Sequence, residues 1–152
     1  MNKMFLAMAV ALGLGTFFSL PAYSQAKPET LVRQRQAAMV LQGKYFGPLN
    51  LMAQGKIPYD QATVVRNAGY LDALSRMPWD GFAASTKGEK SRALPAVFTD
   101  SAKFKEAQDR FEADVSKLVA VSKSGDEAAV KSQIAAVNKS CGACHQDFRE
   151  KQ

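Results

Sequence analysis

Close to the end of the chain stands the run Cys141-Gly142-Ala143-Cys144-His145, a Cys-x-x-Cys-His motif. Two thiols at this spacing can add across the two vinyl groups of one haem, and the adjacent imidazole can coordinate its iron. On a helix the three side chains fall at i, i+3 and i+4 and share one face. The motif therefore predicts a chain folded around covalently attached haem c, one per chain, held by Cys141 and Cys144 with His145 as the iron ligand.

Other uses of a Cys-x-x-Cys pair agree less well with the sequence. Structural zinc takes four ligands, and these two cysteines and one histidine are the only Cys and His residues in the chain. A thioredoxin-like redox pair sits near a βαβ pattern, and no strand pattern surrounds the motif. A structural disulfide stays open as an alternative, but it leaves the neighbouring His145 unexplained.

Residues 1–24 have the pattern of a cleaved secretory signal peptide. A short basic start precedes 17 nearly uninterrupted apolar residues, 4–20, and residues 21–24 end in a small-x-small pattern. A transmembrane anchor is the alternative, because this run approaches the length that spans a bilayer. The single flanking lysine and the interrupting glycines favour cleavage after Ser24. Since haem c is attached on the exported side of the bacterial membrane, we expect one periplasmic domain, residues 25–152, without a membrane anchor.

Charge and length limit the classes of partner. Removal of residues 1–24 leaves 128 residues and lowers the formal net charge from +6 to +5, because Lys3 is the only charged residue removed. This length suits one domain with a single core. The positive charge is spread along the chain without an Arg-rich or aromatic-interleaved block. It could attract acidic protein partners, but it does not indicate nucleic-acid binding.

The apolar spacing beyond the signal segment is helical and predicts four helices. We expect them at about residues 28–54, 60–77 and 100–123 and from about residue 127 to the end, with a long connection over 79–95. Pro28 suits the first turn of a helix and Asp60 suits an N-cap. Gly47-Pro48 should bend the first helix or end it early.

Each predicted helix carries one apolar stripe that needs burial. The stripes comprise Leu31, Ala38, Leu41, Tyr45, Leu49 and Met52; Val64, Ala68, Leu71 and Leu74; Phe104, Ala107, Phe111, Val115 and Leu118; and Val130, Ile134, Val137, Cys141, Cys144 and Phe148. Four such helices favour an all-α, antiparallel up-down-up-down four-helix bundle. The haem motif continues the last stripe, so the cofactor should lie among the helices near the C-terminus.

The position of the motif restricts the second axial ligand of iron. Only seven residues follow His145, so a second ligand from the protein must come from upstream. With one histidine in the chain, ligation by two histidines of the same chain is excluded. The sixth position is therefore left to Met39, Met52 or Met77, to a lysine, or to no protein ligand.

Further motifs accompany Cys-x-x-Cys-His in a definite order. They are Arg35-Gln36-x-x-Met39 in the first predicted helix, Pro58-Tyr59-Asp60 before the second, Pro78-Trp79-x-x-Phe82 after it, Leu94-Pro95 before the third, and Phe148-Arg149 after the haem motif. With this order over residues 25–152, the chain resembles the cytochrome c′ (c-prime) family of class II c-type cytochromes. The resemblance implies a periplasmic homodimer in which the first two helices form the subunit contact.

The resemblance also implies cofactor-binding roles outside the motif. Arg35 and Gln36 match positions that contact the haem propionates, where a guanidinium fork suits a carboxylate. The other matched positions are Ser91 for a further propionate contact, Trp79 and Phe82 for the pocket walls, and Arg149 for the proximal side of the haem. Without the resemblance, these residues would be taken for solvated or ordinary core positions.

Met39 matches the distal position, over the open face of iron. In much of the family an apolar residue there crowds the sixth site without bonding, which leaves five-coordinate, high-spin iron accessible to nitric oxide and carbon monoxide. Low-spin relatives instead use a methionine of this helix as a permanent ligand for electron transfer, and a thioether can do either. We therefore expect a gas-binding haem protein or, as the alternative, an electron carrier with Met39 as sixth ligand and an unidentified redox partner.

An enzymatic function agrees less well with the sequence. Haem peroxidases and oxygenases use distal acid–base groups on bound oxygen. His145 is committed to iron, and the chain has no second histidine. We expect no catalytic residues, although slow turnover of nitric oxide stays open.

Overall fold

The computed structural model describes residues 26–151, so the predicted signal peptide and its cleavage site lie outside the described residues. The elements are α1 (Pro28–Ala53), α2 (Gln61–Ser75), the 3₁₀ turns η1 (Trp79–Phe82) and η2 (Ala84–Thr86), α3 (Ala96–Thr99), α4 (Ser101–Ser122) and α5 (Glu127–Phe148). In this part of the chain, no helix has both the length and the apolar character required to cross a membrane.

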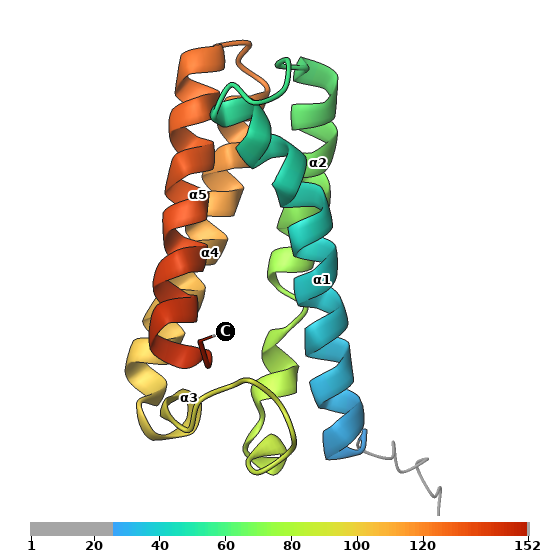
Figure 1. Ribbon diagram of the computed structural model, residues 1–152, viewed down its shortest axis with the longest axis vertical. Helices are drawn as coiled ribbons and strands as arrows, with labels where there is room; N and C mark the ends of the chain where they lie inside the picture. The colour runs from blue at the N-terminus through green and yellow to red at the C-terminus, as the bar shows by residue number, and fades with distance from the viewer. Residues whose placement is uncertain (1–25, 152) are drawn as a thin grey trace, which may run out of the picture.

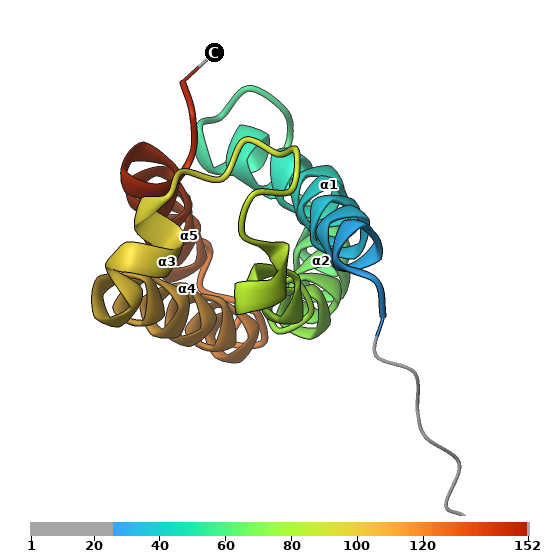
Figure 2. The same ribbon diagram turned by 90° about the horizontal axis from the view of Figure 1, so that it is seen from below.

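The four long helices form an antiparallel up-down-up-down bundle (Figure 1). Seen from below, they surround a common interior: α1 packs against α2 and α5, and α4 packs against α2 and α5 (Figure 2). The short α3 is a single turn that leads into α4. The predicted four-helix bundle is confirmed, and the expected helix bounds differ from the observed ones by only a few residues.

Helix ends follow local chemistry. Asp60 caps α2, because its Oδ1 accepts a hydrogen bond of 2.7 Å from the backbone N–H of Thr63. Asp126 caps α5 in the same way. Pro28 lies in the first turn of α1, where a missing N–H costs nothing. The helix α1 continues through Pro48, and its last turns bend toward α5 (Figure 1).

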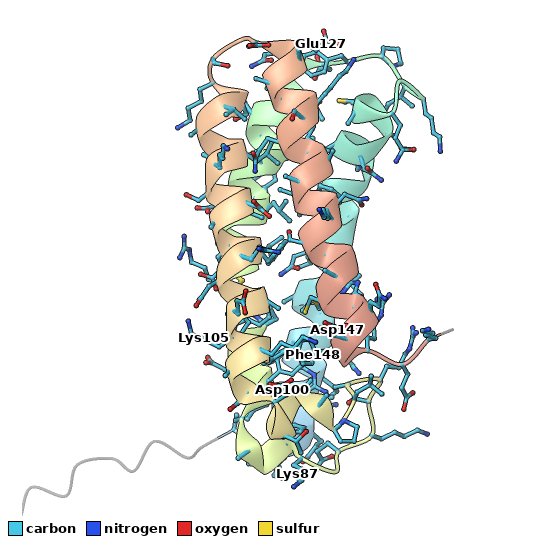
Figure 3. The ribbon with its side chains drawn as sticks, turned by 90° about the vertical axis from the view of Figure 1, so that its left-hand side faces the viewer. Lys87, Asp100, Lys105, Glu127, Asp147 and Phe148 are labelled. Carbon is cyan, nitrogen blue, oxygen red and sulfur yellow. The ribbon has the colours of Figure 1, made fainter. Side chains whose placement is uncertain are left out.

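The core consists of two connected layers of apolar side chains. Its larger part gathers Leu49, Met52, Val64, Ala68, Leu71, Phe111, Val115, Leu118, Val130, Ile134 and Val137 from all four helices. A smaller aromatic cluster at the other end combines Val97, Phe104 and Phe148, the last of which Figure 3 labels near the lower end of α5. Apart from Val97 of α3, all of these residues belong to the predicted stripes of α1, α2, α4 and α5.

The predicted inward face of α1 was wrong at one position. Leu41 is 40% exposed, whereas its neighbour Gln42 is buried. The amide of Gln42 donates a 2.8 Å hydrogen bond to the carbonyl of Leu74 near the end of α2, which also accepts from the N–H of Met77 at 3.2 Å. The inward face of α1 also carries Arg35, which is 5% exposed. Polar side chains with partners on other elements therefore replace part of the expected apolar stripe.

Candidate haem site

A cavity of about 660 Å³ lies inside the bundle, within the range of about 300–1,000 Å³ typical of cofactor pockets. Its walls come from the four long helices and the segment that follows α2. All ten residues predicted for the site line this one cavity: Arg35, Gln36, Met39, Trp79, Phe82, Ser91, Cys141, Cys144, His145 and Arg149. The fold thus brings together residues that are more than one hundred positions apart in the sequence.

The α5 side of the cavity carries the motif. Cys141, Cys144 and His145 are half-buried, and both cysteines are free thiols. Burial raises the pKa of Cys141 to about 11 and also raises that of Cys144. Burial lowers the pKa of His145, with a further contribution from the positive charges of Arg149 and Arg92. The lowered pKa of His145 favours the neutral imidazole, which is the form that binds a metal.

The α1 side carries Arg35, Gln36 and Met39 within about one helical turn. The guanidinium of Arg35 donates to the carbonyl of Gly81 and, at 2.7 Å, to Oγ of Ser91. It also lies 4.5 Å from the centre of the Phe82 ring. Arg35 therefore contacts two other predicted site residues from distant parts of the chain, Phe82 and Ser91.

The charge of Arg35 has no carboxylate partner among the described residues. Burial lowers the pKa of Arg35, and no acidic side chain offsets that effect. A buried cation without a counter-ion is costly, so this position suits an anionic group brought by a ligand. The two propionates of a haem are such groups. The buried guanidinium, the Cys-x-x-Cys-His face and the cavity volume fit a bound haem c.

The remaining wall is aromatic. The Trp79 ring lies 6.2 Å from Phe82 and meets Phe104 and Phe111 edge-on at 6.3 Å and 6.4 Å between ring centres. Phe104 in turn meets Phe148 edge-on at 5.0 Å. Flat apolar rings of this kind suit the faces and edges of a planar macrocycle.

A short extended segment joins the far side of the pocket to the end of α5. Ala93 and Arg149 form an isolated antiparallel bridge. The N–H of Leu94 donates to the carbonyl of Phe148 at 3.0 Å, and the N–H of Glu150 donates to the carbonyl of Arg92 at 2.9 Å. Because Arg149 follows the last residue of α5, this bridge fixes its backbone one helical turn after His145, to whose carbonyl the N–H of Arg149 donates at 3.2 Å.

Several cavity residues were missed by the sequence analysis. They include Gln42, Phe46, Leu71, Arg92, Asn138 and the three core phenylalanines Phe104, Phe111 and Phe148. The phenylalanines were predicted only as core, and hydrophobic periodicity does not separate a core position from a pocket wall. Arg92 carries no local signal, because only the bridge after α5 brings it to the site.

A zinc site has no support in the described residues. Between residues 26 and 151, no three His, Cys, Asp or Glu side chains gather as a possible metal site. The two thiols and His145 therefore lack the further ligand that tetrahedral zinc requires.

Comparison with known proteins agrees with this site. A sequence model described as Cytochrome C' matches residues 30–149. Cytochrome c' of Rubrivivax gelatinosus is 40% identical over 126 residues, which cover 82% of this chain and 98% of the relative. Its crystal structure superposes with a TM-score of 0.78 at 38% identity over the same shares of both chains.

Two further structures belong to cytochrome c prime of Alcaligenes xylosoxidans. One is a nitric oxide complex and the other a carbon monoxide-bound form, both of variant proteins. Each superposes with a TM-score of 0.77 at 36% identity and covers 83% of this chain and 98% of that chain. Family match, sequence identity and bundle architecture agree, and the chain belongs to the cytochrome c′ family.

Proposed function

We propose that this protein carries one haem c, bound covalently through Cys141 and Cys144 with His145 as the proximal iron ligand. The observation that carries the proposal is the single cavity that all ten predicted site residues line. Bound haem supplies an iron centre that takes small axial ligands. Arg35, with Gln36 and Ser91 nearby, would hold the propionates, while Trp79, Phe82 and Arg149 would border the haem.

We propose that Met39 crowds the distal side without ligating iron, which leaves a five-coordinate, high-spin centre. Met39 is half-buried and lines the cavity one turn beyond Arg35. Of the described residues around the cavity, none is an aspartate, a glutamate or a lysine. An uncharged diatomic gas needs no such group, and the related Alcaligenes proteins have been solved with nitric oxide and carbon monoxide. Reversible binding of these gases is the function that the site supports best.

Optical spectra of the haem-loaded protein test this proposal. We expect a high-spin ferrous spectrum that changes sharply when nitric oxide is added. A low-spin ferrous spectrum that ignores the gas would support the alternative, a six-coordinate electron carrier with Met39 as the sixth ligand. The thioether of Met39 at the cavity wall is the observation that keeps this second function open.

We propose that the protein binds ligands and takes part in electron transfer, and that it is not an enzyme. The titratable side chains that line the cavity are the three arginines Arg35, Arg92 and Arg149, together with the two cysteines and His145. Under the proposal, the cysteines and the histidine are committed to the haem. An arginine is a poor proton donor near neutral pH, so general acid catalysis on a bound ligand lacks its usual group.

We propose that residues 1–24 are a cleaved signal peptide and that residues 25–152 function in the periplasm. The support is the sequence pattern of the segment together with the thiols of the motif, whose attachment to haem requires export. N-terminal sequencing of the protein from a periplasmic extract should begin at Gln25.

We propose a homodimer with contacts through α1 and α2. The large apolar side chains that are exposed in the described part of the chain lie on α1, on α2 or directly after α2: Val40, Leu41, Leu51, Tyr70 and Met77. Their exposure favours a protein partner over solvent. A second copy is the partner that the family resemblance implies.

The variant Leu41→Glu should convert the dimer to a monomer, because it places a charge in the apolar contact between subunits. Sedimentation velocity on the haem-loaded protein measures the mass directly. Ala113→Glu, which adds the same charge at an exposed position of α4, should leave the dimer intact. An unchanged dimer in Leu41→Glu would contradict a contact at this position.

A further inference from the structure

Glu112 of α4 connects the outside of the bundle to the pocket wall. Its Oε1 accepts a 2.6 Å hydrogen bond from the indole Nε1 of Trp79. Its Oε2 accepts from Nη1 of Arg76 at 3.3 Å. The side chain of Glu112 is 23% exposed and that of Arg76 is 58% exposed. The carboxylate therefore has one oxygen turned to a wall residue and the other turned to a surface cation.

The hydrogen bond between Trp79 and Glu112 sets the orientation of the Trp79 ring. The rings of Phe82, Phe104 and Phe111 contact Trp79 at ring-centre distances of 6.2–6.4 Å. Such contacts give packing but tolerate a flipped or tilted indole, because neither face of the ring is chemically distinct. The N–H edge is distinct, since it donates and cannot accept. A short charge-assisted bond at this edge selects one orientation.

We propose that Glu112 is a positioning residue for Trp79, and through it for the haem wall that Trp79 forms. The inference rests on the proposed haem pocket and adds to it a residue outside the cavity. Arg76 offsets the charge of the partly buried carboxylate and keeps its second oxygen engaged. Asp72 supports Arg76 from α2, with 3.7 Å between Oδ1 and the guanidinium Nη2.

Trp79 is the only tryptophan in the chain, so its fluorescence reports this contact without interference. Bound haem quenches a nearby indole to an extent that depends on the distance and orientation of the ring. One fixed orientation gives one short fluorescence lifetime. We expect that single lifetime in the natural protein after its haem content has been verified by its absorption in alkaline pyridine.

The variant Glu112→Leu removes the acceptor and keeps the volume of the site. We expect a second, longer lifetime, because loss of a hydrogen bond to a charged group shifts the ratio of fixed to displaced indole by roughly tenfold or more. Glu112→Gln retains an acceptor oxygen without the charge and should keep the short lifetime dominant. Glu106→Leu removes an exposed carboxylate from the same helix and should leave the lifetime unchanged.

Circular dichroism in the Soret band provides a second readout, because it senses aromatic rings that couple to the haem. Glu112→Leu should change this signal in the otherwise natural protein. It should leave the signal unaltered in a Trp79→Phe background, because phenylalanine has no N–H to donate. A short single lifetime in Glu112→Leu, or an equal effect of Glu112→Leu with and without Trp79, would overturn the proposal. So would a Glu112→Gln variant that loses the short lifetime completely. Haem content and gas binding are measured separately, so failure of the proposed function would be recognised as such.

Discussion

Met39→Ala is expected to raise the affinity of the ferrous protein for carbon monoxide by about 5- to 150-fold. If Met39 crowds the distal site, the gas must displace its side chain into an already packed wall, and overpacking of this kind costs about 1–3 kcal/mol. Truncation to alanine removes that cost from the bound state, and 1–3 kcal/mol corresponds to the stated range of affinity. Equilibrium titration followed in the Soret band measures the effect.

Met77→Ala is the matched control, because it removes the same thioether from a side chain that is 58% exposed and does not line the cavity. It should leave carbon monoxide affinity unchanged. The spectrum before gas is added separates the two proposed functions. A natural protein that is low-spin and becomes high-spin in Met39→Ala would show that Met39 is a ligand, and the gas-binding proposal would then be wrong.

The four-helix bundle could be predicted because the patterns that specify its helices lie in short stretches of sequence. Apolar residues at spacings of three and four define α2, α4 and α5, and most of them are buried as expected. The N-cap at Asp60 uses an atom only three residues from its partner. The Cys-x-x-Cys-His motif also acts locally, since three positions on one helical face present both thiols and the imidazole together.

The register of α1 could not be predicted in the same way. Gln42 and Arg35 are buried because their partners, the carbonyl of Leu74 and the groups around Gly81 and Ser91, come from other elements. Hydrophobic periodicity assigns such polar side chains to the surface. For Arg35, residue type alone favoured solvent, whereas the structure buries this side chain at the cavity wall.

Contacts that involve the long connection between α2 and α3 could not be predicted from the sequence either. Ser91 reaches Arg35 over 56 positions, and Glu112 reaches Trp79 over 33. A glutamate on an amphipathic helix is usually a solvated residue, so its type gives no hint of an indole partner. The resemblance identified Trp79 as a wall but contained nothing about what holds the ring.

Arg35→Leu is expected to lower the stability of the haem-loaded protein by about 3–5 kcal/mol, the usual effect of removing one member of a buried charge pair. The variant leaves the proposed propionate without its cation, and the carbonyl of Gly81 keeps only the 3.3 Å hydrogen bond from the hydroxyl of Thr86. The stability of Arg35→Lys should fall between that of the natural protein and that of Arg35→Leu, because an ammonium group keeps the charge but cannot donate as a fork to several acceptors at once. Chemical denaturation followed by the Soret band measures each free energy of unfolding.

The sign of the effect of Arg35→Leu is what tests the pairing. Without an anion in the pocket, a cation that is 5% exposed and lacks a carboxylate partner destabilises the folded protein. An apolar replacement would then be neutral or stabilising. With a propionate beside it, the same replacement is strongly destabilising. Arg33→Leu, two residues earlier on an exposed face of α1, should change stability by no more than about 0.5 kcal/mol. A variant at Arg35 that is as stable as the natural protein would mean that the propionates have another partner.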